Sequence, residues 1–322
     1  MTYNSYCITG GKMSSADNCL DRIINQVHQA DCIDFMKKIP TESIDMILCD
    51  LPYGTTQNNW DCCIPLEKLW KEYKRIIKPN GVVALTSQGI FTAKLILSEP
   101  KLFKYKWIWE KSKPTNFLNA KKQPLRKYEE VCVFYKKQPA YHPQMTSGTP
   151  YNKGVRKNQL SGSYGDFKPS LVQSDGERYP TDIIYFKTAE SEGEVVHPTQ
   201  KPVGLGRYLI KTYTNPGDIV LDNTCGSGSF LVSALLEGRN FIGIEKNEDV
   251  ALFKDRPIDY IEVCRKRLLD AWANLPDELK QNIIRSNLFT DEPELPRKIT
   301  MPEDIDQEND QLGLGIIKEL AI

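Results

Sequence analysis

The sequence predicts an α/β fold with a doubly wound, mostly parallel sheet. Short apolar runs alternate with segments of helical periodicity, which is the order of strands and helices in such a fold. The apolar runs are nearly continuous, as expected for strands that are covered on both faces. At 322 residues the chain is long enough for one large domain with an insert.

The first half of the chain contains the first part of this alternation. The run IDMILC that follows Ser43 predicts a buried strand over 43–49. A helix is predicted over 65–78, where apolar residues recur every three or four positions, and Pro-Asn-Gly at 79–81 ends it. The other elements predicted here are strands over 22–27 and 82–86 and a helix through Phe91 and Leu97 that ends at Pro100.

The alternation stops in the middle of the chain and returns after residue 201. Residues 111–179 are rich in Lys, Gly, Pro, Ser and Asn, and only 131–135 reads as a clear strand. The elements predicted afterwards are a helix from Pro202 to Tyr213, a strand over 219–221, a helix from Ser229, a strand over 241–244 and a long helix that ends near Ala273.

Charge is distributed unevenly along the chain. The 42 basic and 42 acidic residues cancel in total. The stretch 101–187, however, contains 17 basic and seven acidic residues, a net charge near +10. The stretch 271–322 contains five basic and 11 acidic residues, a net charge near −6. We therefore expect an anionic partner to meet the middle of the chain, while the acidic tail is solvated.

Composition also argues against several classes of protein. The nine cysteines have no CxxC spacing and there are only three histidines, so no metal site is expected. No apolar run approaches the roughly 18 residues of a membrane helix, and the N-terminus lacks a signal-peptide pattern. Unpaired thiols are typical of a reducing compartment. These features predict a cytoplasmic protein that does not act in a membrane.

A glycine loop at 226–228 is the first candidate binding site. The predicted strand over 219–221 leads into Asp222, the Gly-Ser-Gly turn opens a helix, and the next strand ends in Glu245. Glycines allow a ligand to approach the backbone closely, and an acid about 20 residues further on suits a ribose. The third glycine of a dinucleotide fingerprint is replaced by Leu231. The loop alone is equally well explained as a structural turn, but together with Glu245 it favours a nucleoside site.

Asp50 is the second candidate, because it follows the predicted strand over 43–49 directly. A helix N-cap or a turn acid would be a sufficient explanation of Asp50 without Tyr53 three residues later. Ligands of open α/β sheets bind at the carboxyl ends of the strands. If the strands before Asp50 and Asp222 are neighbours, both loops face one crevice.

Four segments of this sequence resemble the motifs of a known protein family. DLPYG at 50–54 resembles the Asp-Pro-Pro-Tyr motif of DNA amino-methyltransferases, and LDNTCGSGS at 221–229 resembles their S-adenosylmethionine loop. The order of the two motifs is that of the beta class. VHPTQKP at 196–202 and the segment from His28 to Asp50 match two further segments of that class. The resemblance covers about 25–135 and 185–270.

The resemblance implies a seven-stranded Rossmann-like methyltransferase sheet with an inserted target-recognition region. It further implies methyl transfer from S-adenosylmethionine to the amino group of adenine in duplex DNA, by base flipping, in a restriction-modification system, a phage or an orphan enzyme. The domains expected are an N-terminal extension (1–20), a catalytic half (21–110), the target-recognition insert (111–190), a cofactor-binding half (191–273) and the acidic tail (274–322).

The site residues follow from the same resemblance. The catalytic residues would be Asp50, Leu51, Pro52 and Tyr53, with Asp50 and the carbonyl of Leu51 accepting from the amino group and Tyr53 stacking on the base. Glu245 would bind the ribose, Asp31 the adenine of the cofactor, and Lys201 its carboxylate. The full set expected at the cofactor is Asp31, Cys32, Asp50, His197, Thr199, Gln200, Lys201, Asp222, Thr224, Gly226, Ser227, Gly228, Glu245 and Lys246.

Three residues depart from the family pattern, and alternatives stay open. Leu51 replaces the first Pro of the catalytic motif, and Asn223 and Thr224 replace Pro and Phe of the cofactor loop. An acid at position 50 favours adenine over cytosine N4. Methylation of cytosine N4 or of RNA, and a catalytically silent subunit of a complex, are the competing functions. A homodimer and a cognate restriction endonuclease are further partners that the family suggests.

Overall fold

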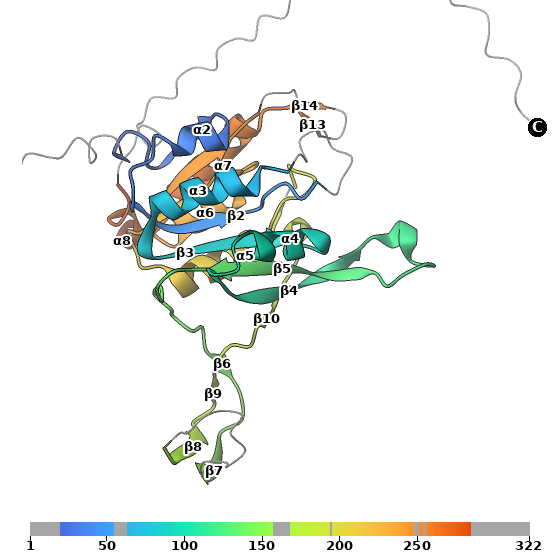
Figure 1. The fold of residues 1–322 in the computed structure, drawn as a ribbon, viewed down its shortest axis with the longest axis vertical. Helices are drawn as coiled ribbons and strands as arrows, with labels where there is room; N and C mark the ends of the chain where they lie inside the picture. The colour runs from blue at the N-terminus through green and yellow to red at the C-terminus, as the bar shows by residue number, and fades with distance from the viewer. Residues whose placement is uncertain are drawn as a thin grey trace, which may run out of the picture. The chain divides into compact units, whose positions relative to one another are not determined.

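An eight-stranded sheet is the centre of the molecule. The computed structural model describes residues 20–54, 63–156, 168–193, 195–247, 251–253 and 256–284. In this part of the chain the strand order is β1-β12-β11-β2-β3-β5-β4-β10 (Figure 1). Every neighbouring pair is parallel except the two that β5 makes, with β3 and with β4. The strands are β1 (Gln26–Gln29), β2 (Ile44–Cys49), β3 (Ile77–Ser87), β4 (Phe103–Thr115), β5 (Arg126–Phe134), β10 (Ile183–Phe186), β11 (Ile219–Asp222) and β12 (Asn240–Glu245).

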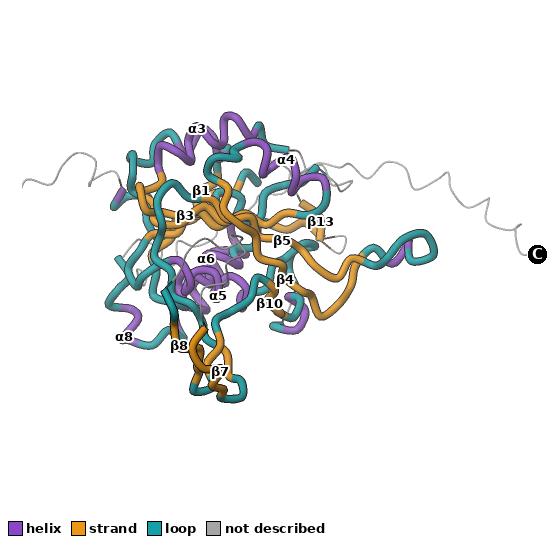
Figure 2. Tube along the Cα trace, turned by 60° about the horizontal axis from the view of Figure 1, so that its bottom comes forward, coloured by secondary structure: helices purple, strands orange, loops and turns teal. Residues whose placement is uncertain are grey.

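Helices cover both faces of this sheet, as Figure 2 shows for α3 and α4 on one side and α5 and α6 on the other. One face, called the α3 face below, is covered by α2 (Cys32–Met36), α3 (Leu66–Ile76) and α4 (Ile90–Ser98). The other, the α5 face, is covered by α5 (Val203–Tyr213), α6 (Ser229–Leu236) and α7 (Tyr260–Ala273). The predicted doubly wound, mostly parallel α/β fold is confirmed.

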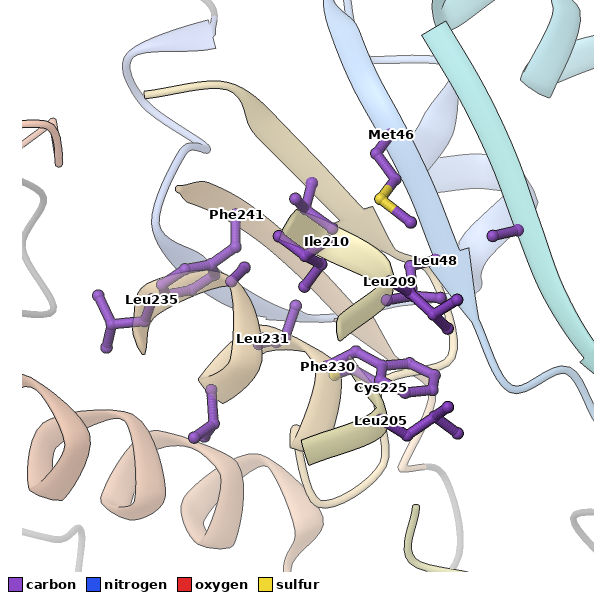
Figure 3. Packing of buried hydrophobic residues seen from close by; sticks show 14 of the residues in the cluster. Met46, Leu48, Leu205, Leu209, Ile210, Cys225, Phe230, Leu231, Leu235 and Phe241 are labelled. Atoms are coloured by element: carbon purple, nitrogen blue, oxygen red, sulfur yellow. The ribbon is translucent and has the colours of Figure 1, made fainter. Parts of the chain in front are cut away.

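The central strand β2 illustrates why the apolar runs are continuous. Met46 and Leu48 point into the α5 face, and Ile47 and Cys49 point into the α3 face, all four fully buried. Figure 3 shows Met46 and Leu48 among the apolar side chains of α5 and α6. Asp45, near the start of β2, is partly buried and pairs with Lys78, and the next acid, Asp50, follows the end of the strand.

Two predicted boundaries differ from the structure. The helix predicted over 65–78 ends at Ile76, because residues 77–81 are extended at the start of β3 instead of forming a turn. The first strand begins at Gln26 and not at residue 22. Residues 20–24 form a turn in which the amide of Ile24 donates to the carbonyl of Leu20, and Asn25 then accepts from the amide of Phe241 on β12.

The middle of the chain contains more of the sheet than expected. Instead of one strand over 131–135, β4 and β5 form a long antiparallel hairpin that ends in a 3₁₀ turn at Phe117–Asn119 (Figure 1). The sheet has eight strands instead of seven, since the short run Ile183–Phe186 pairs in parallel with β4 as β10. Residues 111–190 therefore contribute β5 and β10 to the main sheet.

Smaller elements complete the described part of the chain. They are α8 (Asp277–Lys280), a second 3₁₀ turn (Ala189–Ser191), and three two-stranded ribbons, β6 (Thr146–Ser147) with β9 (Glu177–Arg178), β7 (Tyr151–Arg156) with β8 (Ser170–Ser174), and β13 (Ala251–Phe253) with β14 (Arg256–Ile258). Among the described residues, no helix has the length and apolar character needed to cross a membrane. Residues 1–19 and 285–322, which hold most of the predicted extension and tail, lie outside the described residues.

Replacing Gly228 tests the packing of the glycine loop against α7. Gly228 has φ +78°, and a Cβ added there would lie 2.2 Å from Sγ of Cys264. We expect Gly228→Ala to lower the free energy of unfolding by at least about 2 kcal/mol, measured by urea denaturation without ligand. Gly154→Ala is the control, because Gly154 has φ +69° but an added Cβ would meet no described atom within 4 Å. Only the backbone penalty of about 1 kcal/mol is expected there. Equal losses for the two variants would contradict the tight contact.

Candidate active site

The two candidate loops lie at the same edge of the sheet. β2 and β11 are parallel neighbours, with Met46 opposite Val220 and Ile47 opposite Leu221. From this pair the chain continues outward in opposite directions, through β3 on one side and β12 on the other. The pair is therefore a topological switch point, where the carboxyl ends of the strands leave a crevice. The expectation that these strands are neighbours is confirmed.

The carboxylate of Asp50 is held by three donors. Oδ1 accepts from the hydroxyl of Tyr53 at 2.9 Å and from Oγ1 of Thr86 on β3. Oδ2 accepts from Nζ of Lys201 at 2.5 Å. Asp50 does not cap α3, whose first residue follows Pro65. The carboxylate is thus fixed at the edge of the sheet by side chains from three separate parts of the chain.

The loop after Asp50 is fixed by packing on both sides. The Leu51 side chain is buried on the α3 face, and Oγ1 of Thr224 donates to the carbonyl of Asp50 at 3.2 Å. The ring of Tyr53 stacks on Phe91 of α4, with 4.9 Å between the ring centroids and 26° between the planes. Burial and the charge of Asp50 raise the pKa of Tyr53, so its hydroxyl remains a donor.

A chain of alternating charges continues from Asp50. Nζ of Lys201 lies 3.5 Å from Oε2 of Glu129, and Nζ of Lys111 lies 3.1 Å from Oε1 of the same carboxylate. Both lysine side chains are buried. Burial lowers the pKa of Lys201, but the charges of Asp50 and Glu129 outweigh this effect and raise the pKa above its usual value.

The sequence alone did not indicate that Thr86, Glu129 and Lys111 belong to this site. A signal was present, because the acids Glu129 and Glu130 directly precede the apolar run at 131–134, as Asp50 directly follows another. β5 is antiparallel to β3, so it begins at the edge where the parallel strands end. That reversal brings Glu129 to the Asp50 side, and nothing in the local sequence indicates it.

The glycine loop and the acid after it are joined by a hydrogen bond. The amide of Gly226 donates to Oε2 of Glu245 at 2.7 Å, and the amide of Cys225 donates to the carbonyl of Ile244 at 3.0 Å. Gly226 and Gly228 both have positive φ, +50° and +78°. Burial raises the pKa of Glu245.

Asp222 and Asn223 form the buried floor of this loop. Oδ1 of Asp222 accepts from the amide of Thr224 at 3.2 Å, and burial raises the pKa of Asp222 to about 8. Oδ1 of Asn223 accepts from the hydroxyl of Tyr73 at 2.5 Å and from the thiol of Cys49 at 2.9 Å. The oxygen of Asn223 is therefore satisfied inside the core, whereas its buried Nδ2 has no hydrogen-bond partner among the described residues.

The segment 196–202 packs beside the glycine loop. An added Cβ on Gly226 would lie 3.6 Å from the ring of His197, which contacts Tyr260 with 4.6 Å between the centroids. Nδ1 of His197 accepts from the amide of Thr199 at 3.2 Å. Burial lowers the pKa of His197 to about 4, so the ring is neutral near pH 7. Oε1 of Gln200 accepts from the amide of Val196 at 3.1 Å and closes the turn.

The remaining expected residues lie at the end of β1 and β12. Asp31 caps α2 by accepting from the amides of Ile33 and Asp34 at 2.9 and 3.3 Å. Cys32 is buried, and burial raises its pKa to about 11. The amide of Ala30 donates to the carbonyl of Glu245 at 3.0 Å, which places Asp31 near that acid, while the neighbouring Lys246 is exposed.

Arg267 of α7 is a further residue that sequence analysis missed. Its Nη1 donates to the carbonyl and the hydroxyl of Ser227 at 2.6 and 3.1 Å, and to the hydroxyl of Ser229 at 3.2 Å. Through these hydrogen bonds the guanidinium joins α7 to the glycine loop and restrains the loop. Among the described residues, no three side chains of the metal-binding types gather into a cluster.

Comparison with known proteins gives consistent matches. The model of the N6_N4_Mtase family, described as DNA methylase, matches residues 44–252, which include both loops of the site. The type II methyltransferase M2.MboI of Moraxella bovis is 28% identical over 286 residues, covering 80% of this chain and 92% of that protein. The DNA adenine methyltransferase YhdJ of Escherichia coli K12 is 28% identical over 249 residues, covering 71% and 81%.

Solved structures share the fold. The crystal structure of the M1.HpyAVI–SAM complex superposes with a TM-score of 0.50 at 23% sequence identity. The match covers 76% of this chain and 99% of that chain. The core of the fold, with the sheet and its covering helices, is therefore common to both proteins.

The raised pKa of Asp222 predicts a specific pH dependence of stability. Between pH 4 and 8 the folded protein retains a proton on Asp222 that the unfolded chain, with a pKa near 3.8, has lost. The free energy of unfolding therefore falls as pH rises through this window. In Asp222→Asn the contribution is absent, so its stability relative to wild type should increase from pH 5 to 8 and level off above. Urea unfolding at one-unit steps measures this, and parallel curves for the two proteins would rule out the assignment.

Proposed function

Because the chain belongs to the N6_N4_Mtase family of DNA methylases, we propose that it is a site-specific DNA methyltransferase. It transfers a methyl group from S-adenosylmethionine to the exocyclic amino group of adenine in duplex DNA, after the base has been flipped out of the helix. The single observation that carries the proposal is the Asp50 carboxylate, fixed at the carboxyl edge of the sheet and joined through Thr224 to the glycine loop.

The residues at this edge fit S-adenosylmethionine. An added Cβ on Gly226 would meet only the ring of His197 among described residues within 4 Å, so a ligand can approach the backbone there. Glu245 presents a carboxylate beside the loop for ribose hydroxyls. When bound, the cofactor supplies a methyl group activated on a sulfonium. The residues that would hold it are Asp31, Cys32, Asp50, His197, Thr199, Gln200, Lys201, Asp222, Thr224, Gly226, Ser227, Gly228, Glu245 and Lys246.

The catalytic loop orients the amino group of the target base. Its lone pair is delocalised into the ring until both amino hydrogens are bonded to acceptors. Asp50 supplies one acceptor and the main-chain carbonyl of Leu51 the other. Pro52 biases Leu51 toward extended geometry, which keeps that carbonyl at the edge. Asp50 and the Leu51 carbonyl would thereby direct the nitrogen lone pair toward the methyl group that bound S-adenosylmethionine would supply, and the nitrogen would release a proton to solvent.

Tyr53 provides the surface on which the flipped base stacks. Phe91 backs one face of the Tyr53 ring, and the hydrogen bond to Asp50 fixes the ring in its plane. Stacking and two hydrogen bonds hold the base in one orientation, and orientation supplies much of the rate of such a transfer.

Adenine is favoured as the target by the acid at position 50 and by the name of the relative YhdJ, a DNA adenine methyltransferase. Methylation of cytosine N4 or of RNA would use the same loop. A silent subunit is disfavoured, because the hydrogen bonds that hold Asp50 are all formed.

The β4–β5 hairpin is the surface that we assign to duplex DNA. Lys121, Lys122 and Arg126 are exposed in and after the turn that joins the two strands, as are the apolar side chains of Phe117 and Leu118. Cations on this surface can bind phosphates, and the polar and apolar residues next to them can contact bases. The tip of the hairpin and β5 belong to the target-recognition region proposed over 111–190, which the catalytic and cofactor-binding halves (21–110 and 191–273) flank.

The wider setting is also a proposal. The name of M2.MboI, a type II methyltransferase of a bacterium, supports a role beside a cognate restriction endonuclease in the cytoplasm of a bacterial or phage-infected cell. A homodimer is a further partner that the family resemblance suggests, and the oligomeric state can be measured by light scattering.

Removing the Asp50 carboxylate tests the activity and the site together. Wild type and Asp50→Ala are incubated with whole-genome-amplified bacterial DNA, which carries no methylation, and labelled S-adenosylmethionine. Loss of an acceptor of the transition state should slow transfer by at least about 100-fold. Asp34→Ala, which removes an exposed acid of α2, should leave the rate unchanged.

The position of the label decides between the candidate substrates. Sequencing of the product should place the methyl group on adenine N6 at one recognition sequence. Label on cytosine N4, or equal labelling of single-stranded RNA, would replace adenine in duplex DNA as the target. No transfer by wild type would overturn the proposed function.

Removing two hairpin cations tests the DNA surface. Lys121→Ala/Lys122→Ala should weaken duplex binding and reduce the slope of log Kd against log salt by about 2, since each lysine contacts one phosphate. Lys68→Ala/Lys71→Ala removes the same charge from two exposed positions of α3 and should leave both quantities unchanged. Equal effects of the two double variants would indicate a general field and not a contact surface.

A further inference from the structure

We propose that Lys201 exchanges between two carboxylates, Asp50 and Glu129, and that this exchange frees Asp50 to accept a hydrogen bond from the target base. In the structure Nζ of Lys201 contacts Oδ2 of Asp50 at 2.5 Å, with Oε2 of Glu129 3.5 Å away. The inference rests on the proposed function, because it concerns how Asp50 becomes available to an amino group.

The hydrogen bonds that Asp50 already accepts are the reason to expect an exchange. Its Oδ1 already accepts from Tyr53 and Thr86, and its Oδ2 from Lys201. A base amino group that approaches Oδ2 meets the ammonium of Lys201 at the same atom. Oδ2 keeps one lone pair for the amino group, but the Lys201 ammonium at 2.5 Å draws electron density from the carboxylate and makes it a weaker acceptor. Transfer is therefore favoured when Lys201 moves away from Asp50.

Glu129 is a second carboxylate that Lys201 can bind, so the Lys201 ammonium keeps an anionic partner when it leaves Asp50. Oε2 of Glu129 is buried and accepts no hydrogen bond within the described part of the chain. A buried carboxylate oxygen without a donor is unfavourable, so a donor that moves toward it gains a hydrogen bond. From 3.5 Å, a shift of under about 1 Å brings Lys201 to hydrogen-bond distance. A buried ammonium with no second anion nearby could not move in this way.

Lys111 holds the Glu129 carboxylate in the position in which it can accept from Lys201. Its buried Nζ holds Oε1 of Glu129 at 3.1 Å and leaves Oε2 directed to Lys201. Lys111 also balances the charge of Glu129 when Lys201 is on Asp50. Glu129 is thus a positioning residue that acts through Lys201, and Lys111 is a positioning residue that acts through Glu129.

The adjacent residue Glu130 provides a matched control. Successive side chains of a strand point to opposite faces, and Val131 and Val133 lie on the α5 face with Cys132 and Phe134 on the α3 face. Glu129 therefore shares the face of Val131. Glu130 lies on the other face, where Thr92 donates to its Oε2 at 2.6 Å and Lys106 pairs with its Oε1.

The experiment compares Glu129→Gln with Glu130→Gln. The substrate is an oligonucleotide duplex that carries the recognition sequence mapped with wild type. The Glu129→Gln substitution keeps the shape of the side chain but removes the charge that draws Lys201 from Asp50. We expect kcat to fall at least tenfold in Glu129→Gln, with KM for DNA and for S-adenosylmethionine within about twofold of wild type. In Glu130→Gln kcat should stay within about twofold, and thermal melting identifies any loss of fold.

A double-mutant cycle separates exchange from a merely structural role. If Lys201 stays on Asp50 in Glu129→Gln, removing Lys201 in that background relieves the block. Lys201→Met/Glu129→Gln, assayed at saturating S-adenosylmethionine because Lys201 is also assigned to the cofactor, should therefore have a kcat at least as high as that of Glu129→Gln alone. A double variant whose loss equals the product of the single losses would overturn the exchange, since independent effects multiply.

These measurements distinguish failure of the proposed function from failure of the Lys201 exchange. If wild type transfers no methyl group to DNA, the proposed function is wrong. If wild type transfers but Glu129→Gln retains the kcat of Glu130→Gln, only the exchange is wrong. A parallel rise of KM for DNA would assign Glu129 to DNA binding, which also overturns the exchange.

Discussion

Burial of the central strands on both faces is the constraint on which the rest of the structure depends. β2 and β11 lie between two layers of helices, and the acids of the two loops, Asp50 and Asp222, stand at the ends of these strands. Because the two strands are parallel neighbours, their ends coincide. Thr224 can therefore donate to the carbonyl of Asp50 across 174 positions of sequence. The residues that hold Asp50 come from this edge: Tyr53 from the loop after β2, Thr86 from near the end of β3 and Lys201 from the loop before α5.

Electrostatics at this edge follow a single rule. Removing a charge from water costs several kcal/mol unless a partner of opposite sign lies beside it. Asp50, Lys201, Glu129 and Lys111 satisfy the rule by alternating in sign. For Asp222 and His197 burial is the dominant effect, and it shifts their pKa values to about 8 and about 4, which favours the neutral forms near neutral pH. The charged groups are thus concentrated beside the loop that begins at Asp50, and neutral groups line the floor of the glycine loop.

The departures from the family motifs leave the backbone of both loops in place. Leu51 inserts its side chain into the core of the α3 face, where an apolar residue of any compact shape can pack. Asn223 is polar inside the core, but the hydroxyl of Tyr73 and the thiol of Cys49 both donate to its Oδ1. In each case the side chain is directed away from the crevice, and main-chain groups are left at its surface.

The sequence by itself determined the alternation of strands and helices, the two loops at strand ends and the acids in them, because apolar periodicity and strand-end polarity are local properties. It did not indicate that β4 and β5 join the sheet as a hairpin, or that Glu129 and Lys111 lie beside Lys201. Only the tertiary structure decided these, since the reversed direction of β5 is set by its pairing with β3 and β4. Pairing is a contact between distant segments, and the charge chain at Asp50 exists only after those contacts have formed.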